Sequence, residues 1–383
     1  MNYQARQKLI AELLRENPGL EKASATELLP VLSRYVSRYN RQRQLSLQAQ
    51  KRFVREIYNT MRGFDILQAY IDDPEVTEIM VNGPKSVFIE KAGKIRPTAA
   101  VFDDREHLTQ VITRSFGRAN RLINEQKPLA GMRLSDGSRV HAVLPPAAPS
   151  GPCLAIRRFT GIRPSLSELV RRKSLSPEAA KYLEAEVLNK ANIFISGGTG
   201  SGKTTFLNAL SGLIPPHERI ITIEDAAELD LQGLPNLLRL EARQAGPDGQ
   251  GAVSLEDLIK SSLRLRPDRI IVGEVRGAES FEMIQAMSTG HPGSMSTGHG
   301  NNCLEMLDRL ALMILMNSSL PWEAIRRLLA STLDLIIHLE RLSSGRRVVR
   351  EIAQIKGFDG QQFELKKVFY RQADGDLELI DEN

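Results

Sequence analysis

The chain has 383 residues, of which 42% are hydrophobic and 25% are charged, with a formal net charge of +5. This length exceeds the size at which a single hydrophobic core usually stops growing, so we expect two domains. No run approaches the roughly eighteen apolar residues of a spanning helix. The N-terminus lacks a signal peptide's apolar segment, so a cytoplasmic protein is expected. Cys153 and Cys303 offer neither a disulfide framework nor metal-ligand spacing.

The first 60 residues hold the excess of positive charge, with eleven Lys and Arg against five Asp and Glu. Apolar residues recur there at helical spacing, as in Leu9, Leu13 and Leu14. We therefore expect residues 1–65 to form an N-terminal helical arm of two or three amphipathic helices. Its basic faces suit an acidic partner, an anionic membrane surface or nucleic acid, and they equally suit plain solvation of surface helices.

Residues 66–160 have the mixed pattern of a small α+β domain. The expected elements are a hairpin of Thr77–Val81 with Ser86–Glu90, a helix at Glu106–Phe116, and strands near 139–144 and 154–159. Residues 161–185 contain Pro164 and Pro177 and are expected to link this domain to a second one.

From residue 186 to the end, short β-rich runs alternate with helical patterns. The expected strands begin with NIFIS, RIITIE and DRIIVGE, and the last three lie at 335–339, 348–354 and 363–370; the expected helices are 255–265, 279–287, 304–316 and 322–332. Such alternation predicts an α/β fold with a mainly parallel sheet covered by helices on both faces. Ligands of such sheets bind at the carboxyl ends of the strands.

The stretch NIFISGGTGSGKTT, from Asn192 to Thr205, has the G-x-x-x-x-G-K-[ST] pattern of a phosphate loop. Glycines let successive backbone N–H groups turn onto nucleotide phosphates, and the next helix directs its positive end at the same anion. Lys203 then brings its positive charge to the β- and γ-phosphates, and the Thr204 hydroxyl is a ligand for Mg²⁺. The expected cofactors are ATP and Mg²⁺, bound by Gly197, Gly198, Thr199, Gly200, Ser201, Gly202, Lys203, Thr204 and Thr205.

Carboxylates end two of the expected strands, at Glu224 and Glu274. Phosphoryl transfer to water needs one group that orients or deprotonates the water and others that hold Mg²⁺. Both glutamates are candidates for the base that activates the water. Glu274 and Thr204 are the candidate ligands for Mg²⁺. Gly273 stands where many phosphate-loop proteins carry an aspartate. Asp225 and Glu228 follow Glu224, and acids at such places also serve simply as helix caps.

Two histidines, His291 and His299, flank a glycine-rich segment and are expected at the two ends of one short strand. A histidine there can hydrogen-bond a phosphate or a catalytic carboxylate, or it can be an ordinary structural hydrogen-bonder.

Four motifs in fixed order resemble those of the secretion (traffic) ATPase superfamily. They are GGTGSGKTT (Walker A), ITIEDAAEL (Asp box), RLRPDRIIVGEVRG (Walker B) and STGHPGSMSTGHG (His box). Upstream, DDPEVTEIMVNGP, RLSDGSRVHAVLPP and LAIRRFT are most similar to the CpaF branch, the tight-adherence (Flp/Tad) pilus assembly ATPases. The resemblance covers roughly residues 70–345.

This resemblance implies a homo-hexameric ring whose subunits combine an N-terminal sensor domain (66–160) with a RecA-like P-loop NTPase domain (186–383). It implies ATP hydrolysis coupled to pilus assembly or type II/IV-related secretion, at platform proteins of the inner membrane and with peripheral membrane association. Family arginines that reach the γ-phosphate map onto Arg139 and Arg157. Arg276, beside Glu274, is a further candidate, and His299 is in register with the His box.

Two other readings stay open. A conjugative or type IV secretion ATPase for DNA-protein export shares every catalytic motif. A nucleotide-regulated scaffold, or a nucleic-acid-binding module that holds ATP without turning it over, is of a different class. We favour an ATP-hydrolysing motor over a module that only holds ATP, because Glu274 argues against an inactive site. Nucleic acid is not expected as a partner.

Overall fold

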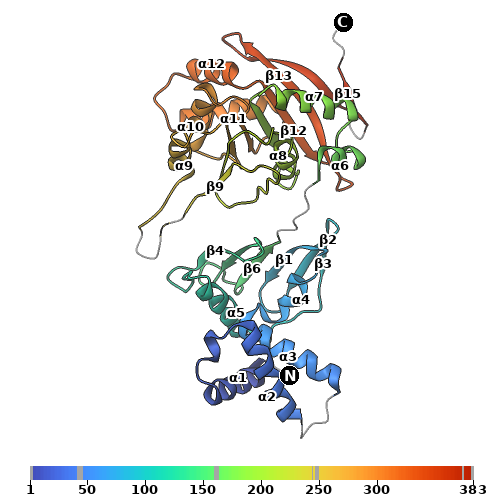
Figure 1. The fold of residues 1–383 in the computed structure, drawn as a ribbon, viewed down its shortest axis with the longest axis vertical. Helices are drawn as coiled ribbons and strands as arrows, with labels where there is room; N and C mark the ends of the chain where they lie inside the picture. Colours follow the sequence, from blue (N-terminus) through green and yellow to red (C-terminus); the bar gives the residue numbers. More distant parts are fainter. Residues whose placement is uncertain are drawn as a thin grey trace. The chain divides into compact units, whose positions relative to one another are not determined.

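The computed structural model describes residues 3–40, 46–158, 164–243, 245, 250–372 and 375–380. The chain divides into two compact units, Met1–Thr160 and Gly161–Asn383, which are coloured blue to teal and green to red in Figure 1. Each unit has its own sheet and its own hydrophobic cores.

Unit 1 begins with the helices predicted for the arm. They are α1 (Tyr3–Glu16), α2 (Ala25–Asn40) and α3 (Leu47–Arg62), with a short 3-10 turn, η1 (Leu20–Lys22). Their apolar faces form one cluster that includes Leu13, Leu28, Leu32 and Ile57, each almost fully buried. The amphipathic pattern of the arm is therefore confirmed, because each helix turns its apolar face toward the other two.

The rest of unit 1 is a six-stranded antiparallel sheet with the order β3-β2-β1-β6-β5-β4. The strands are β1 (Val76–Asn82), β2 (Val87–Lys91), β3 (Lys94–Pro97), β4 (Leu129–Arg133), β5 (Arg139–Val143) and β6 (Cys153–Arg157); the helices are η2 (Asp65–Leu67), α4 (Gln68–Ile71) and α5 (Arg105–Arg118). The predicted hairpin and the helix at α5 are confirmed. Strand β3 was not predicted, because all four of its residues are exposed and show no apolar alternation.

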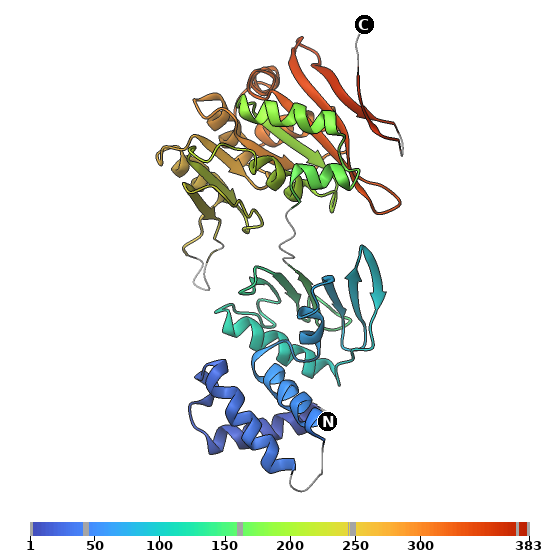
Figure 2. The ribbon, with the colours of Figure 1, turned by 45° about the vertical axis from the view of Figure 1, so that its right-hand side comes forward.

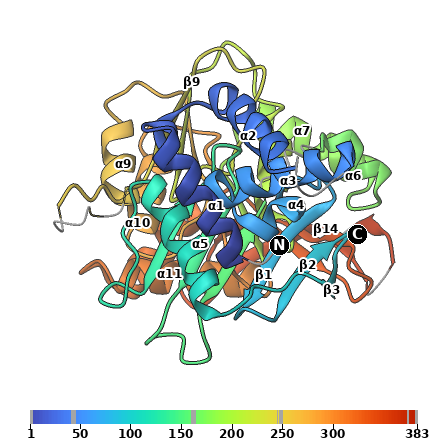
Figure 3. The same ribbon diagram turned by 90° about the horizontal axis from the view of Figure 1, so that it is seen from below.

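The helical arm, expected as a separate segment, belongs to the same compact unit as the sheet. Buried Asp65 accepts a hydrogen bond from Thr60, lies 2.8 Å from His107 Nε2 and pairs with Arg6 at 3.3 Å. The Tyr3 ring stacks on His107 at a centroid distance of 3.6 Å. Figure 3 shows α1 beside α5. The contacts of His107 with Asp65 and Tyr3, and of Asp65 with Arg6, join residues 42 to 104 positions apart, so periodicity could not reveal them.

Unit 2 is built on a nine-stranded sheet with the order β15-β14-β13-β12-β7-β11-β10-β8-β9. The strands are β7 (Ile193–Gly197), β8 (Ile220–Glu224), β9 (Leu237–Glu241), β10 (Arg269–Val272), β11 (Met295–Gly298), β12 (Leu335–Arg341), β13 (Arg347–Phe358), β14 (Phe363–Arg371) and β15 (Leu377–Leu379). The strands from β9 to β12 in this order pair in parallel, and β13, β14 and β15 extend the sheet antiparallel. The predicted α/β fold with a mainly parallel sheet is confirmed.

Helices cover both faces of this sheet, as Figure 2 shows. Helices α6 (Leu166–Arg171), α7 (Pro177–Leu188) and α8 (Lys203–Ser211) lie on one face, and α9 (Leu255–Ser262), α10 (Glu279–Ser288), α11 (Cys303–Leu315) and α12 (Trp322–Thr332) lie on the other. Across the described ranges, no helix combines the length and the apolar character that crossing a membrane requires.

The prediction that residues 161–185 are a linker is wrong for their described part. Helices α6 and α7 lie there, and Leu169, Ala179 and Leu183 are buried in the core of unit 2. Pro177 is the first residue of α7, behind the N-cap Ser176. Proline at that position starts a helix rather than interrupting one, because its missing N–H has no intrahelical partner to lose.

Candidate functional site

The glycine-rich loop joins the buried strand β7 to helix α8, whose first residues are Lys203, Thr204 and Thr205. Gly200 and Gly202 have φ angles of +72° and +96°, in the left-handed region that favours glycine. A Cβ at Gly197 would lie 2.5 Å from Ser201 Oγ and 2.6 Å from Leu339 O, so only glycine fits. The backbone therefore turns tightly at the start of α8, as an anion cradle requires.

Lys203 is almost fully buried and folds back over this loop. Its Nζ donates to the carbonyl oxygens of Gly197 and Gly198 at 2.9 and 3.0 Å, and lies 3.4 Å from His299 Nδ1. A phosphate oxygen would be a stronger acceptor than these neutral carbonyl groups, because its negative charge attracts the lysine ammonium group directly.

Four predicted site residues form a continuous chain of contacts: Lys203, His299, Glu274 and Arg276. His299 Nε2 lies 2.8 Å from Glu274 Oε1, and Arg276 donates to Glu274 Oε2 at 2.7 Å. Partial burial, with the charge of Lys203, lowers the pKa of His299 below its ordinary value of 6.5. A neutral ring accepts from Lys203 through Nδ1. Its Nε2 lies close to Glu274 Oε1 without hydrogen-bond geometry, and that oxygen is buried with no hydrogen-bond partner among the described residues.

Glu224 has a different setting from Glu274. Its buried carboxylate accepts the backbone N–H groups of Glu228 and Leu229 at 2.6 and 2.8 Å, which holds the segment that follows β8. A Cβ at Gly273 would lie 2.9 Å from Glu224 Cγ. The glycine that replaces the usual aspartate is therefore required by the side chain of Glu224.

Thr204 donates its hydroxyl to Glu228 Oε2 at 3.0 Å. The sequence predicted Thr204 and Glu274 as the ligands for Mg²⁺. In the structure, the carboxylate that is hydrogen-bonded to Thr204 belongs to Glu228. A hydroxyl and carboxylates are oxygen ligands that suit Mg²⁺, which keeps several waters and phosphate oxygens as its other ligands. In the described part of the chain, no group of three or more His, Cys, Asp or Glu side chains is placed to hold a metal ion.

His291 and His299 do flank strand β11, but only His299 joins the phosphate loop. His291 contacts the carbonyl of Ala286 at the end of α10 through Nδ1 at 3.2 Å. It lies before the amino end of β11, whereas the loop lies at the carboxyl ends of the parallel strands. His291 therefore has the structural role that was the alternative to a functional one.

One contact of the loop was missed by sequence reasoning. Arg347, which opens β13, donates from Nε to Gly200 O at 2.9 Å from 147 positions along the chain. A trans peptide unit is planar, so holding the Gly200 carbonyl outward directs the Ser201 N–H the opposite way. The hairpin of β12 and β13 thereby orients the Gly200–Ser201 peptide, whose N–H donates to Gly198 O at 3.3 Å and so holds the loop in its tight turn. No motif surrounds Arg347 that could have indicated this.

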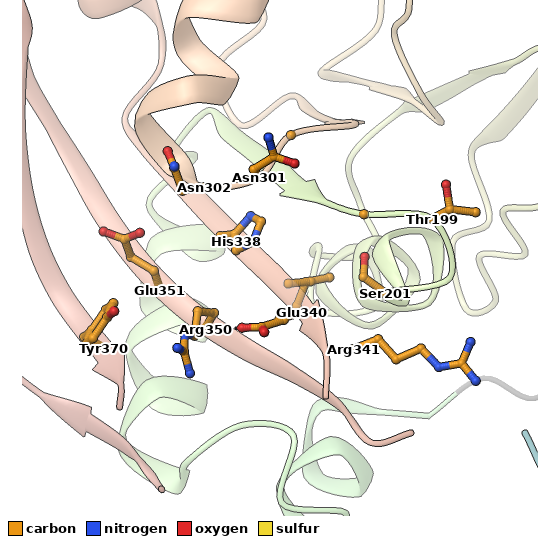
Figure 4. Close-up of a pocket in the computed structure, with 13 residues that line it drawn as sticks. Thr199, Ser201, Asn301, Asn302, His338, Glu340, Arg341, Arg350, Glu351 and Tyr370 are labelled. Carbon is orange, nitrogen blue, oxygen red and sulfur yellow. Dashed lines mark ion pairs between the residues drawn. The ribbon is translucent and has the colours of Figure 1, made fainter. Parts of the chain in front are cut away.

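A pocket of about 510 Å³ opens beside the loop (Figure 4). Its polar and charged lining comes from Thr199, Ser201, Asn301, Asn302, His338, Glu340, Arg341, Arg350, Glu351 and Tyr370. Arg350 and Glu340 pair across it at 3.3 Å. The volume lies within the range of small-ligand sites and adjoins the backbone that would hold phosphates.

The arginines predicted to reach the γ-phosphate lie in unit 1. Arg139 on β5 is directly opposite Arg157 on β6, and on its other side it is opposite Arg133 on β4. Arg157 also lies 3.6 Å from Glu78. Like charges directly opposite each other on neighbouring strands repel, so the row concentrates positive charge on one face of the sheet. Arg133 was missed, although it begins the same motif as Arg139.

Comparison with known proteins shows which family the sequence matches. The sequence profile described as Type II/IV secretion system protein matches residues 60–372. The type IV secretion system protein VirB11 of Brucella suis is 35% identical over 300 residues, covering 71% of this chain and 83% of VirB11. The conjugal transfer protein TrbB of Rhizobium radiobacter is 33% identical, covering 83% and 95%. The ATPase DotB of Legionella pneumophila has a similar fold, with a TM-score of 0.51, 21% identity and coverage of 74% and 77%.

We predict that Arg347→Met weakens binding of both ATP and ADP by about three- to tenfold, the effect of one hydrogen bond. Both nucleotides should lose equally, because Arg347 supports the shape of the loop that holds the phosphates they share. Isothermal titration against each nucleotide measures this. Arg346→Met, which removes the neighbouring exposed arginine of the same hairpin, is the control and is expected to bind normally.

The pKa of His299 in the nucleotide-free protein is expected below 6.5, so the ring is neutral at pH 7. Lys203→Met removes a charge that lowers this pKa and should raise it, whereas Glu274→Gln removes a charge that raises it and should lower it. NMR titration of labelled histidine measures the three values. Lys260→Met, a surface lysine paired with Glu256, should change nothing; shifts of the opposite sign would contradict the contact chain.

Proposed function

Because the chain belongs to the Type II/IV secretion system protein family, a family of secretion ATPases, we propose that it is the ATP-driven motor of a secretion or pilus-assembly apparatus. The observation that carries the proposal is the contact chain from Lys203 through His299 to Glu274. It connects the phosphate loop to the carboxylate that ends the Walker B motif.

Binding of ATP rests on groups already held in place. The amides of the loop and the N-terminus of α8 hold the phosphates, and Lys203 exchanges its two carbonyl acceptors for β/γ-phosphate oxygens. Thr204, with Glu228 or Glu274, holds Mg²⁺, which when bound neutralises part of the triphosphate charge. Arg347 keeps the Gly200–Ser201 peptide in its orientation.

Hydrolysis requires a base near the γ-phosphate, and we assign this role to Glu274. Its carboxylate orients the attacking water and accepts its proton. His299 lies between Lys203 and Glu274, so a change in the position of Lys203 is transmitted to Glu274. Arg276 holds the second carboxylate oxygen. Glu224, whose oxygens hold backbone amides, positions the Asp-box loop instead.

Movement would come from closure of unit 1, the arm with the sensor domain, on the RecA-like unit 2. Arg139 and Arg157, joined by Arg133, would supply donors for the γ-phosphate that ADP cannot engage. A ligand shifts a conformational equilibrium only through such a difference in contacts. We propose that a ring of six copies sets the angle between the units.

Two kinds of apparatus fit this motor. The sensor-domain motifs favour assembly of a tight-adherence pilus, at platform proteins on the cytoplasmic face of the inner membrane. Similarity to VirB11 and TrbB favours type IV secretion or conjugal transfer. Purified protein should be tested for ATPase activity and particle mass, with and without single-stranded DNA and anionic lipid. Stimulation by DNA would favour conjugal transfer, and stimulation by lipid alone would favour the pilus motor.

The catalytic assignment predicts that two variants fail at different steps, one at hydrolysis and the other at nucleotide binding. Glu274→Gln should bind ATP nearly normally and hydrolyse it about a hundredfold or more slowly, because the amide cannot accept the proton. Lys203→Ala should lose nucleotide binding itself. Titration and single-turnover hydrolysis measure the two steps. Glu256→Gln, on α9 and paired with Lys260 at the surface, serves as the control; normal hydrolysis by Glu274→Gln would move the base to another residue.

The closure mechanism predicts selective loss of ATP affinity. Arg139→Ala or Arg157→Ala should weaken ATP binding by about one to three kcal/mol and leave ADP binding nearly unchanged, as expected for charge-assisted bonds to the γ-phosphate. Hydrolysis should fall further, because charge grows in the transition state. Equilibrium titration of both nucleotides decides the question. Equal losses for ATP and ADP would mean that these arginines only support the fold.

A further inference from the structure

Helices α3 and α5 bring three arginines together in unit 1, outside the residues assigned to ATP. Arg62 is the last residue of α3, and Arg114 and Arg118 lie one turn apart on one side of α5. Tyr58 lies one turn before Arg62 on α3. The two helices are in direct contact here, because Arg118 donates a hydrogen bond to the carbonyl oxygen of Met61.

None of the three arginines has a carboxylate partner in the part of unit 1 that the structure describes. Arg62 donates to the carbonyl oxygens of Leu20 and Ala23 at 3.2 and 2.7 Å. Arg114 Nε and Nη2 are buried and have no hydrogen-bond partner. A buried donor without an acceptor usually costs about 1–3 kcal/mol, and more when it is charged. These guanidinium groups therefore lack a compensating anion.

The electrostatics agree with the geometry. The Arg118 residue is exposed as a whole, but its guanidinium reaches back to α3, where burial and the charges of Arg62 and Arg114 lower its pKa to about 10. Tyr58 is the one neighbour that acts on this pKa in the opposite direction. The carboxylate of Asp65, three residues after Arg62, is already held by Arg6 and His107.

We propose that Arg62, Arg114 and Arg118 form a binding site for a phosphate group, with the Tyr58 hydroxyl as an additional donor. A carboxylate would offset one of the three positive charges, whereas a phosphate brings up to two negative charges and several acceptor oxygens. The forked donors of arginine match those oxygens bidentately. The phosphate belongs either to a phospholipid headgroup or to a soluble phosphate compound.

The first test measures thermal unfolding of the full chain in phosphate and in chloride at equal ionic strength. All variants carry Lys203→Ala, so that the nucleotide loop contributes as little as possible. Phosphate should raise the Tm of this parent, because a ligand that binds only the folded state stabilises it. Arg34→Gln, which alters an exposed arginine on α2, should show the same rise, and Arg114→Gln less than about half of it.

Stability without phosphate separates binding from a structural role. Arg114→Gln removes a buried unpaired charge, so in chloride it should be at least as stable as the parent. If Arg114 merely supported the fold, this variant would be less stable in both buffers and its response to phosphate would be unchanged. An unchanged response to phosphate in Arg114→Gln overturns the proposal, whatever the ATPase activity of the wild type.

Vesicle flotation distinguishes the two sources of phosphate. Vesicles of phosphatidylglycerol with phosphatidylcholine are compared with vesicles of phosphatidylcholine alone, using the parent, Arg34→Gln and Arg114→Gln. Selective loss of binding by Arg114→Gln assigns the site to a lipid headgroup. Equal flotation of all three proteins, with the phosphate response lost only in Arg114→Gln, assigns it to a soluble phosphate compound.

Discussion

The close approach of backbones at Gly197 is the constraint on which the ATP site depends. Strand β12 lies parallel to β7, and its Leu339 carbonyl oxygen would be only 2.6 Å from a Cβ at Gly197. This contact fixes where the loop leaves the sheet. The hairpin that continues from β12 then returns to the loop at Arg347. The C-terminal strands thus form one wall of a site whose sequence motif lies more than a hundred residues earlier.

Two further glycines, Gly273 and Gly300, lie where a Cβ would collide with a neighbouring side chain. They lie on the side of the loop that faces Glu274 and His299. Gly273 leaves room for Glu224, and a Cβ at Gly300 would lie 2.8 Å from Ser196 Oγ. Close packing at these points lets β11 end beside the loop, so that His299 reaches both Lys203 and Glu274. His299 therefore lies in contact with both the lysine of the phosphate loop and the carboxylate of Glu274.

Unit 1 carries two groups of arginines that lie close to one another. The row of Arg133, Arg139 and Arg157 lies across neighbouring strands, and the cluster of Arg62, Arg114 and Arg118 lies between helices. Each places like charges close together, which is unfavourable unless an anion joins them. For the cluster of Arg62, Arg114 and Arg118, a ligand that brings a phosphate group would offset this repulsion.

The sequence by itself determined the α/β class and the phosphate loop. It also predicted Lys203, Glu274 and His299 as members of one site, and the structure brings these three into contact. These predictions follow from local rules, because periodicity sets strands and helices and parallel strands end at one edge. Tertiary structure alone decided which carboxylate faces Thr204, why position 273 is glycine, that α6 and α7 belong to the core of unit 2, and that Arg347 and Arg114 matter. Those facts depend on contacts between residues distant in sequence, and such contacts leave no periodic or motif signal in the chain.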